Sequence, residues 1–145
     1  MKSCVFCKII NKEIPASVIF EDDTIICILD IHPVNDGACM VIPKEHIDHF
    51  TDLPDELASH IMIAAQKIGR NIMKTLGPER VGYVVHGYGV AHAHFVIVPQ
   101  NDANDITSRK IAKVEDGVVK FDHTLIPAAE RTDLDNLARQ LNISL

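Results

Sequence analysis

The sequence predicts an α+β domain, in which an antiparallel sheet of about five strands carries one long packed helix and a C-terminal extension. Three observations predict this class. Short β-branched runs lie between turn residues, one long stretch has apolar residues at helical spacing, and 145 residues suffice for a hydrophobic core. We therefore expect one domain over residues 1–145, with a core over 1–99 and an extension over 100–145.

The first third of the chain predicts a helical turn and then three strands. The turn covers residues 6–11, and Pro15 ends it because proline cannot continue a helix. Asp22 and Asp23 lie between two apolar runs and predict the turn of a hairpin. Pro43 stops the last strand of this group. The strands are expected over residues 17–21, 24–30 and 38–42.

One long helix is expected over residues 54–76. Pro54 suits the first helical turn, and Asp55 and Glu56 favour the positive end of the helix dipole. Gly77 and the proline after it end the helix. His60 lies off the apolar stripe and is expected on the surface. The stripe comprises Leu57, Ile61, Ala65, Ile68, Ile72 and Leu76.

The remaining elements follow the same logic. A strand over 81–85 returns through a glycine-containing turn into a strand that carries two histidines and runs to Val98. A small hairpin is expected over 111–121, around Asp116 and Gly117. Apolar residues at helical spacing predict a final short helix over 134–141.

His92 and His94 are the residues that point most directly to chemistry. In a strand, residues two apart share a face, so the two imidazoles would stand side by side, with Ala93 and Phe95 facing the other way. The glycine-rich turn before them, which includes Gly89, could offer main-chain N–H groups to an anion. The pair could therefore hold a metal or attack a phosphate. The plain alternative is a half-buried strand with two hydrogen-bonded histidines.

Composition excludes several classes of function. The net charge is −6 and no stretch is strongly basic, which argues against a nucleic-acid or membrane binder. The N-terminus lacks the apolar core of a signal peptide, so a cytoplasmic location is the default expectation. Cys27 and Cys39 lie in apolar runs and are expected to be buried. Cys4 and Cys7 form a Cys-x-x-Cys pair, which suggests a metal or redox pair.

The order of the motifs resembles the histidine triad family, in its Hint-like branch. The resemblance covers about residues 4–99. It implies a homodimer with a half-barrel sheet in each subunit, and a protein that transfers or hydrolyses nucleotidyl groups or binds nucleotides. The motifs that carry it are CVFCKII (4–10), EIPA (13–16), FEDD (20–23), LDIHP (29–33), VIPKEH (41–46), LPDEL (53–57) and HAHFVIVP (92–99).

The resemblance implies that His94 is the nucleophile and that His92 is the first histidine of the family's His-x-His-x-His motif. Three positions depart from the family pattern. Val96 stands at the third histidine, Ala38 replaces a histidine that often follows the glycine, and His86 replaces an asparagine. Since valine has no hydrogen-bond donor, a donor would have to come from elsewhere, for which the candidates are His86, His32 and Ser108.

The resemblance also implies ligand sites. Asp30 would accept the ribose hydroxyls, although an aspartate at a strand end also commonly caps a turn. Phe6, Ile9, Ile28 and Ile31 would line a base pocket, or else belong to the core. The N–H groups near His92 and Gly89 would contact the phosphate, and His86 would lie nearby. A structural zinc would be held by Cys4, Cys7, His46 and His92; the alternative is a reduced, metal-free pair.

Three functions remain open from the sequence. The first is a hydrolase or transferase that cleaves nucleoside 5′-phosphate conjugates through His94, with no organic cofactor. The second is a zinc-stabilised nucleotide-binding protein with little catalysis, because Val96 and Ala38 have replaced family histidines. The third is a metal-dependent hydrolase in which His86, His92 and His94 face an open zinc, although four protein ligands would leave no place for water.

Overall fold

A five-stranded antiparallel sheet organises the chain in this computed structural model, which describes residues 4–107 and 110–144. Its strand order confirms the predicted fold class. Across the sheet the strands lie in the order β1 (Val18–Glu21), β2 (Ile25–Leu29), β3 (Cys39–Pro43), β5 (Phe95–Gln100) and β4 (Arg80–Val84).

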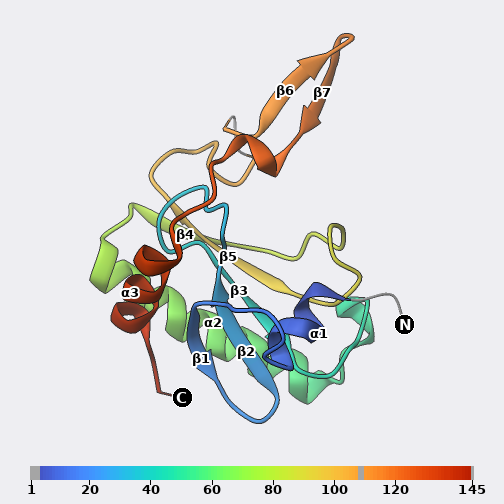
Figure 1. Cartoon of the computed structure of the whole chain (residues 1–145), viewed down its shortest axis with the longest axis vertical. Coiled ribbons are helices and arrows are strands. Elements are labelled where there is room, and N and C mark those ends of the chain that lie inside the picture. Colours follow the sequence, from blue (N-terminus) through green and yellow to red (C-terminus); the bar gives the residue numbers. More distant parts are fainter. Residues whose placement is uncertain (1–3, 108–109, 145) are drawn as a thin grey trace.

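Helices cover the two faces of the sheet unequally (Figure 1). The long helix α2 (Asp55–Leu76) and the C-terminal α3 (Arg131–Leu141) pack on one face, and both contribute buried side chains to a single apolar cluster. Leu141 of α3 is as fully buried there as Ile61 of α2. The short α1 (Val5–Ile10) belongs to the opposite face, where Phe6 joins Ile28 and Ile42 in a second cluster. The two predicted buried cysteines, Cys27 and Cys39, lie in the first cluster.

The histidines are not in a strand, which corrects the expectation from spacing. Strand β5 begins at Phe95, and the segment before it is held by other partners. The main-chain N–H of His92 donates to the Val90 carbonyl at 2.8 Å, and that of Ala93 donates to the Ile47 carbonyl at 2.7 Å. The second bond ties the segment to the connection between β3 and α2, and the alternating side chains of a strand begin only at Phe95. Ala93 is buried as expected.

His60 lies off the apolar stripe and is partly exposed, as expected, and it also bonds to another element of the fold. Its Nε2 lies 2.6 Å from Oδ2 of Asp22 at the β1–β2 turn, so it joins α2 to that hairpin. Burial by itself would raise the pKa of Asp22. The hydrogen bonds from His60, from Thr24 and from the N–H of Ile25 outweigh burial and lower this pKa from 3.8 to about 2.

We expect Asp22→Asn to lower the free energy of unfolding by about 1–2 kcal/mol at pH 7, after allowance for solvent screening. The folded pKa lies below the ordinary value, so ionised Asp22 stabilises the fold above about pH 4. This contribution is lost as the pH falls towards about 2. Urea unfolding at several pH values would measure it. The two proteins should converge near pH 2, and the exposed neighbour Asp23→Asn is the control. A difference that persists at low pH would contradict the role of ionised Asp22.

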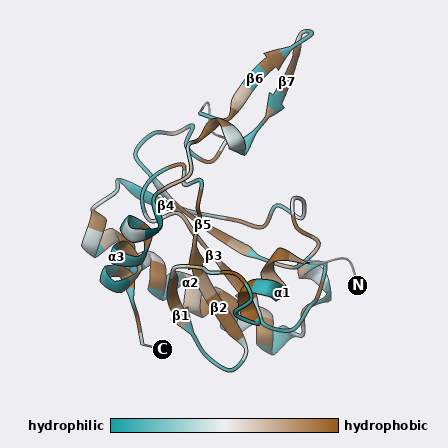
Figure 2. Ribbon diagram, viewed as in Figure 1, coloured by the Kyte–Doolittle hydropathy of each residue, from teal (hydrophilic) through white to brown (hydrophobic). Residues whose placement is uncertain are grey.

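A second, two-stranded sheet projects from the body (Figure 1). It consists of β6 (Ala112–Glu115) and β7 (Val118–Phe121), as the sequence predicts. Cross-strand pairing places Ala112 opposite Phe121 and Val114 opposite Val119, so one face of this hairpin is entirely apolar. That face is exposed, with Phe121 at 59%. Figure 2 shows hydrophobic and hydrophilic residues side by side in this projecting hairpin.

The opposite face of the hairpin is charged. Lys113 contacts Glu115 at 3.1 Å and Asp122 at 3.2 Å, and Lys120 contacts Glu115 at 2.7 Å. The hairpin is therefore amphipathic. An isolated two-stranded hairpin is marginally stable in water. Among the helices of the described residues, none has the length and apolarity needed to cross a membrane.

Candidate active site and metal centre

Four side chains that could bind a metal meet at one end of the sheet. The ligand atoms of Cys4, Cys7, His46 and His92 all lie within 4.8 Å of one another. Cys4 and Cys7 come from the N-terminal end of α1, His46 from the connection after β3, and His92 from the segment before β5. The set is the one that the family resemblance implies, and the fold brings it together from three separate parts of the chain.

The distances within this cluster fit a tetrahedral zinc site. Sγ of Cys7 lies 3.3 Å from Nδ1 of His46 and 3.6 Å from Nδ1 of His92, and Sγ of Cys4 lies 3.4 Å from the same His92 atom. The Nδ1 atoms of His46 and His92 are 3.2 Å apart. Ordinary zinc–sulfur and zinc–nitrogen bonds in a tetrahedron separate neighbouring ligand atoms by roughly 3.3–3.8 Å. The donor set and its spacing therefore fit zinc.

His92 is fixed in one tautomer. Its Nε2 lies 2.8 Å from the Pro43 carbonyl, and since a carbonyl can only accept, this nitrogen carries the proton. Nδ1 is then unprotonated and faces the two thiols. Burial lowers the pKa of His92 below its ordinary value, and the charges of His46 and His94 lower it further, which favours the neutral ring that a metal requires.

A metal requires ionised thiols, whereas it requires a neutral His92 ring. Burial raises the pKa of Cys7, and the adjacent Cys4 raises it further through its hydrogen bond and its charge. The Cys7 thiol therefore resists ionisation in the protein alone. A divalent cation would reverse this, because a coordinating thiol is deprotonated. This chemistry favours a metal over a free redox pair.

His94 is held in the tautomer that a nucleophile needs. Its Nδ1 lies 2.8 Å from the main-chain carbonyl of His92, and so it donates to that oxygen. In the neutral ring this leaves Nε2 without a proton and able to attack. The Phe6 ring packs edge-on against His94 at a centroid distance of 5.3 Å and against His92 at 5.8 Å. The two histidines thus share the Phe6 side of the sheet, although they do not occupy a strand.

The predicted nucleotide-binding residues fall into two groups, one in the second apolar cluster and one outside it. Phe6 and Ile28 are buried in the second apolar cluster, and Ile9 packs against it. Asp30 Oδ1 accepts the N–H of His32 at 2.8 Å, which is the turn-capping alternative, and Ile31 is exposed. His86 and Gly89 are also exposed, in the connection between β4 and β5. Asp30 also lines a cavity of about 340 Å³ beside α3.

Two of the positions that depart from the family pattern carry apolar side chains that are packed in the sheet or beside it. Val96 is half-buried in β5, and Ala38 is buried just before β3. Of the candidate replacement donors, His32 is bonded through Nδ1 to the Ile126 carbonyl at 2.7 Å. His86 lies near Tyr88, with ring centroids 6.4 Å apart. Ser108 lies outside the described residues.

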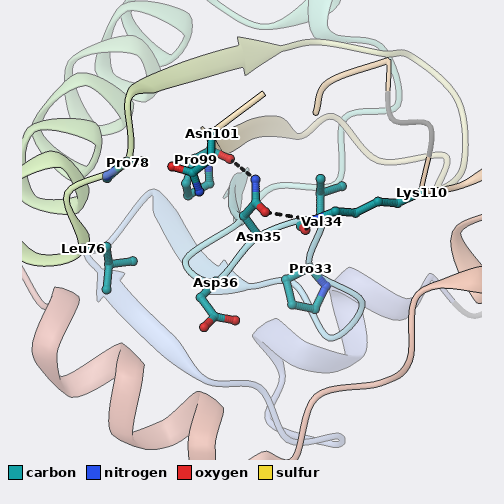
Figure 3. Close-up of a pocket in the computed structure, with 9 residues that line it drawn as sticks. All are labelled: Pro33, Val34, Asn35, Asp36, Leu76, Pro78, Pro99, Asn101 and Lys110. Carbon is teal, nitrogen blue, oxygen red and sulfur yellow. Dashed lines mark hydrogen bonds between the residues drawn. The ribbon is translucent and has the colours of Figure 1, made fainter. Parts of the chain in front are cut away.

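The cavities do not coincide with the histidines. The cavity beside His92 and His94 measures only about 10 Å³, with Phe50 and Val90 in its wall. A cavity of about 450 Å³ lies instead near the end of α2 (Figure 3), and none of the predicted site residues lines it. Its residues are Pro33, Val34, Asn35, Asp36, Leu76, Pro78, Pro99, Asn101 and Lys110.

A hydrogen-bond network around the buried Asp105, beside that cavity, is not predicted by the sequence. Nδ2 of Asn35 donates to the Pro99 carbonyl and to Asp105, each at 2.8 Å, and Asp105 also accepts the N–H of Asn101 at 2.8 Å. Lys110 donates to Asn35 Oδ1 at 2.9 Å. Burial by itself would raise the pKa of Asp105, but these bonds lower it. The network closes the segment after β5 onto the loop before β3, and no sequence signal distinguishes Asp105 from its neighbours.

Comparisons of the sequence and of the structure with known proteins identify one and the same protein family. A model of the HIT domain matches residues 11–103. A HIT-like protein of Methanocaldococcus jannaschii is 38% identical over 106 residues, which are 70% of this chain and 81% of that protein. An adenosine 5′-monophosphoramidase of Schizosaccharomyces pombe is 36% identical over 104 residues, 68% of this chain and 74% of that protein. A zinc-bound histidine triad family protein of Mycobacterium smegmatis superposes with a TM-score of 0.72 at 28% identity, covering 96% and 90% of the two chains.

Proposed function

This chain belongs to the histidine triad (HIT) family, and from that premise we propose that it hydrolyses or transfers the nucleotidyl group of nucleoside 5′-phosphate conjugates through His94. The conjugates are of the phosphoramidate or dinucleoside polyphosphate type. One observation carries the proposal. The bond from His94 Nδ1 to the His92 carbonyl leaves Nε2 of the neutral ring as the attacking atom. The phosphoramidase name of the yeast relative supports this class of reaction.

The reaction has two steps. Nε2 of His94 attacks the α-phosphorus, a P–N bond forms, and the bond to the leaving group breaks with its electron pair on that group; a leaving amine takes up a proton from water as it departs. The positive charge on the ring is shared with Nδ1–H and the His92 carbonyl that accepts from it. Water then attacks the same phosphorus, releases the nucleoside monophosphate and regenerates His94. Gly89 would supply a main-chain N–H to the phosphate, whereas the N–H of His92 is already bonded to Val90.

The nucleoside would lie on the Phe6 side of His94. Ile9, which is half-buried beside the buried Phe6 and Ile28, would give the base an apolar contact, and Asp30 would accept the ribose hydroxyls. One oxygen of Asp30 caps the turn at His32, but a carboxylate can accept several hydrogen bonds, so the two roles are compatible.

Zinc would be held by Cys4, Cys7, His46 and His92. When bound, the ion would clamp the N-terminal turn and the connection after β3 to the segment that carries His94. The zinc-bound neighbour from Mycobacterium smegmatis supports this assignment at the level of the family. The cluster found among the described residues contains His92 but neither His86 nor His94, which favours a structural site over an open hydrolytic zinc.

The experiment that tests the function is turnover of adenosine 5′-phosphoramidate and of diadenosine polyphosphates, followed by release of AMP. Turnover with a transient covalent nucleotidyl-protein would support the mechanism. The alternative is a zinc-stabilised nucleotide-binding protein with little catalysis, favoured by Val96 and Ala38 in place of family histidines. Binding of AMP without turnover of any conjugate would select that alternative.

We also propose a homodimer, as the family resemblance implies. Strand β4 lies at the edge of the sheet, and exposed apolar residues gather at this edge and on α2. The Tyr83 side chain contacts Gly69 of α2, where an added Cβ would lie 2.0 Å from the hydroxyl, so the strand and the helix form one surface. The apolar residues are Met62, Ile63, Met73, Tyr83 and Val85.

Met62→Glu combined with Tyr83→Asp should weaken such a dimer by at least about 100-fold, because buried unpaired charges cost several kcal/mol at an interface. Sedimentation across a range of concentrations measures the shift to monomer. Val114→Glu, on the hairpin, is the matched control for an added charge. A wild-type protein that stays monomeric at high concentration would contradict the proposal.

A further inference from the structure

The four cysteines of the chain differ in their access to solvent. Cys27 and Cys39 are fully buried in the first apolar cluster. Burial, together with the adjacent Cys39, raises the pKa of Cys27 well above its ordinary value, so this thiol stays protonated and unreactive. Cys4 and Cys7 are half-buried at the start of α1, and the exposed His46 forms the solvent side of their cluster. A small oxidant in solution therefore meets the second pair and not the first.

The sulfur atoms of Cys4 and Cys7 lie within reach of each other. Both belong to the set of ligand atoms that lie within 4.8 Å of one another. Cys-x-x-Cys is a spacing at which disulfides form and open in proteins. An S–S bond is about 2.05 Å long, whereas ligand atoms around zinc stay roughly 3.3–3.8 Å apart. The two sulfur atoms can therefore bind an ion or each other, but not both.

Coordination would prepare this pair for oxidation. A coordinating thiol is deprotonated, and peroxides oxidise the thiolate form of cysteine. Residues that hold a divalent ion here would thus present two ionised sulfur atoms, side by side, at a position that solvent reaches. Partial exposure and a neighbouring resolving cysteine are the features of peroxide-sensitive cysteines.

We propose that Cys4 and Cys7 are a modification site at which a peroxide converts the zinc-bound thiolates into a disulfide and the protein releases the ion. This inference rests on the proposed zinc site and adds a reaction that is separate from nucleotidyl transfer. The Cys7 sulfur, 3.3 Å from Nδ1 of the exposed His46, attacks one peroxide oxygen, the O–O bond breaks, and hydroxide leaves.

The second step closes the disulfide. The Cys4 sulfur attacks the sulfenic acid formed on Cys7, the S–S bond forms, and a second hydroxide leaves. The two hydroxides take up two protons from solvent and become water. The two sulfur atoms have then lost two electrons, and one peroxide has gained them. A thiol reductant reverses the reaction by exchange with the disulfide.

The modification would reach the proposed nucleophile through Phe6. This residue lies between the two cysteines in the sequence, and its ring packs against His94 at a centroid distance of 5.3 Å. Helix α1 has six residues, which are too few for an isolated helix to be stable. Bound zinc would link α1 to His46 and His92, and the disulfide removes that link. Oxidation should therefore loosen the Phe6 side of His94 and lower turnover.

Peroxide treatment of the zinc-loaded protein tests the site without any substrate. We expect hydrogen peroxide to release one zinc ion per chain, measured with a chromogenic chelator, and to form one disulfide within the chain. After denaturation and alkylation, peptide mass spectrometry should find the label on Cys27 and Cys39 only. Dithiothreitol followed by zinc should restore the thiols of Cys4 and Cys7 and the bound metal.

Two further measurements connect the disulfide to the nucleophile. In oxidised protein, hydrogen exchange over residues 5–10 should be at least about 10-fold faster and turnover of adenosine 5′-phosphoramidate at least about 10-fold slower, and reduction with zinc should restore both. Lys8→Ala, in α1 but outside the cluster, should respond as wild type does. The double variant Cys4→Ser/Cys7→Ser controls for oxidation elsewhere, such as that of the exposed Met62 and Met73, because peroxide should not change its turnover further.

The outcomes separate this proposal from those on which it rests. A reduced protein that binds no zinc would contradict the zinc site and, with it, the release proposed here. A protein that keeps its zinc under peroxide, or that loses the thiols of Cys27 and Cys39 first, would overturn the modification site while the zinc site stands. Failure to turn over any conjugate would contradict the proposed function alone, because zinc release and the disulfide are measured without a nucleotide.

Discussion

Replacement of His94 by alanine is expected to lower kcat for any nucleotidyl conjugate by about 10⁴-fold or more, the usual loss when a covalent nucleophile is removed. The reason is specific to Nε2, which no other described side chain can replace at this position. The His94 ring is half-buried, is not one of the four cluster side chains and bonds only to the main-chain carbonyl of His92, so the melting temperature should change little. Steady-state release of AMP measures the loss. His123→Ala, at an exposed position, is the control.

The covalent intermediate gives this prediction a second readout. Acid quenching of the wild-type reaction should trap one nucleotidyl group per active subunit, and mass spectrometry should place it on His94. The alanine variant should trap none and should still bind AMP, because Phe6 and Asp30 are untouched. Retained turnover in the variant would remove His94 as the nucleophile. A wild-type enzyme that turns over but never traps a nucleotide would point to direct attack by water.

The second prediction concerns loss of the zinc ion that we propose for the cluster of Cys4, Cys7, His46 and His92. We expect Cys7→Ser to abolish stoichiometric zinc binding and to lower the melting temperature by on the order of 10 °C, since a ligand present at 1,000 times its Kd stabilises by about 4 kcal/mol. Cys7 contacts both histidines of the cluster, at 3.3 Å and 3.6 Å, so its loss opens two sides of the site. Metal analysis and calorimetry, with and without a chelator, measure the two quantities.

The chelator supplies the control within the same protein. Wild-type protein should lose stability when chelated, and the serine variant should not change further. Lys8→Ala, next to Cys7 in α1 but outside the cluster, should behave as wild type. Zinc that binds the variant with full stoichiometry would exclude Cys7 as a ligand. Turnover should follow the folded fraction and not the concentration of added zinc.

The sheet and the helices could be predicted because each depends on local signals. Strand alternation, Pro43 and Gly77 set the boundaries of β3 and α2, and the structure agrees within a residue or two. The sequence marks α3 only from Leu134, because only its buried positions carry an apolar signal. Its polar first turn, from Arg131, carries no such signal.

The site was harder to predict because it depends on contacts between distant segments. Two-residue spacing predicted a strand through His92 and His94, but main-chain bonds to Ile47 and Val90 hold that segment outside the sheet. The partnership of His60 with Asp22 and the burial of Asp105 leave no trace in local sequence either. The metal cluster could be predicted only through the family resemblance, because Cys4 and His92 are 88 positions apart.

His92 contributes its ring to the proposed zinc site and its main-chain carbonyl to the orientation of His94, the proposed nucleophile. Its ring faces the thiols, and its carbonyl orients His94. A substitution at this position therefore reports a mixture of lost metal and lost orientation, whereas His46→Ala reports the metal alone. The same arrangement provides a probe. A cobalt(II) ion bound in place of zinc would have an optical spectrum sensitive to the geometry of His92, and this spectrum would register nucleotide binding at His94 without any label on the substrate.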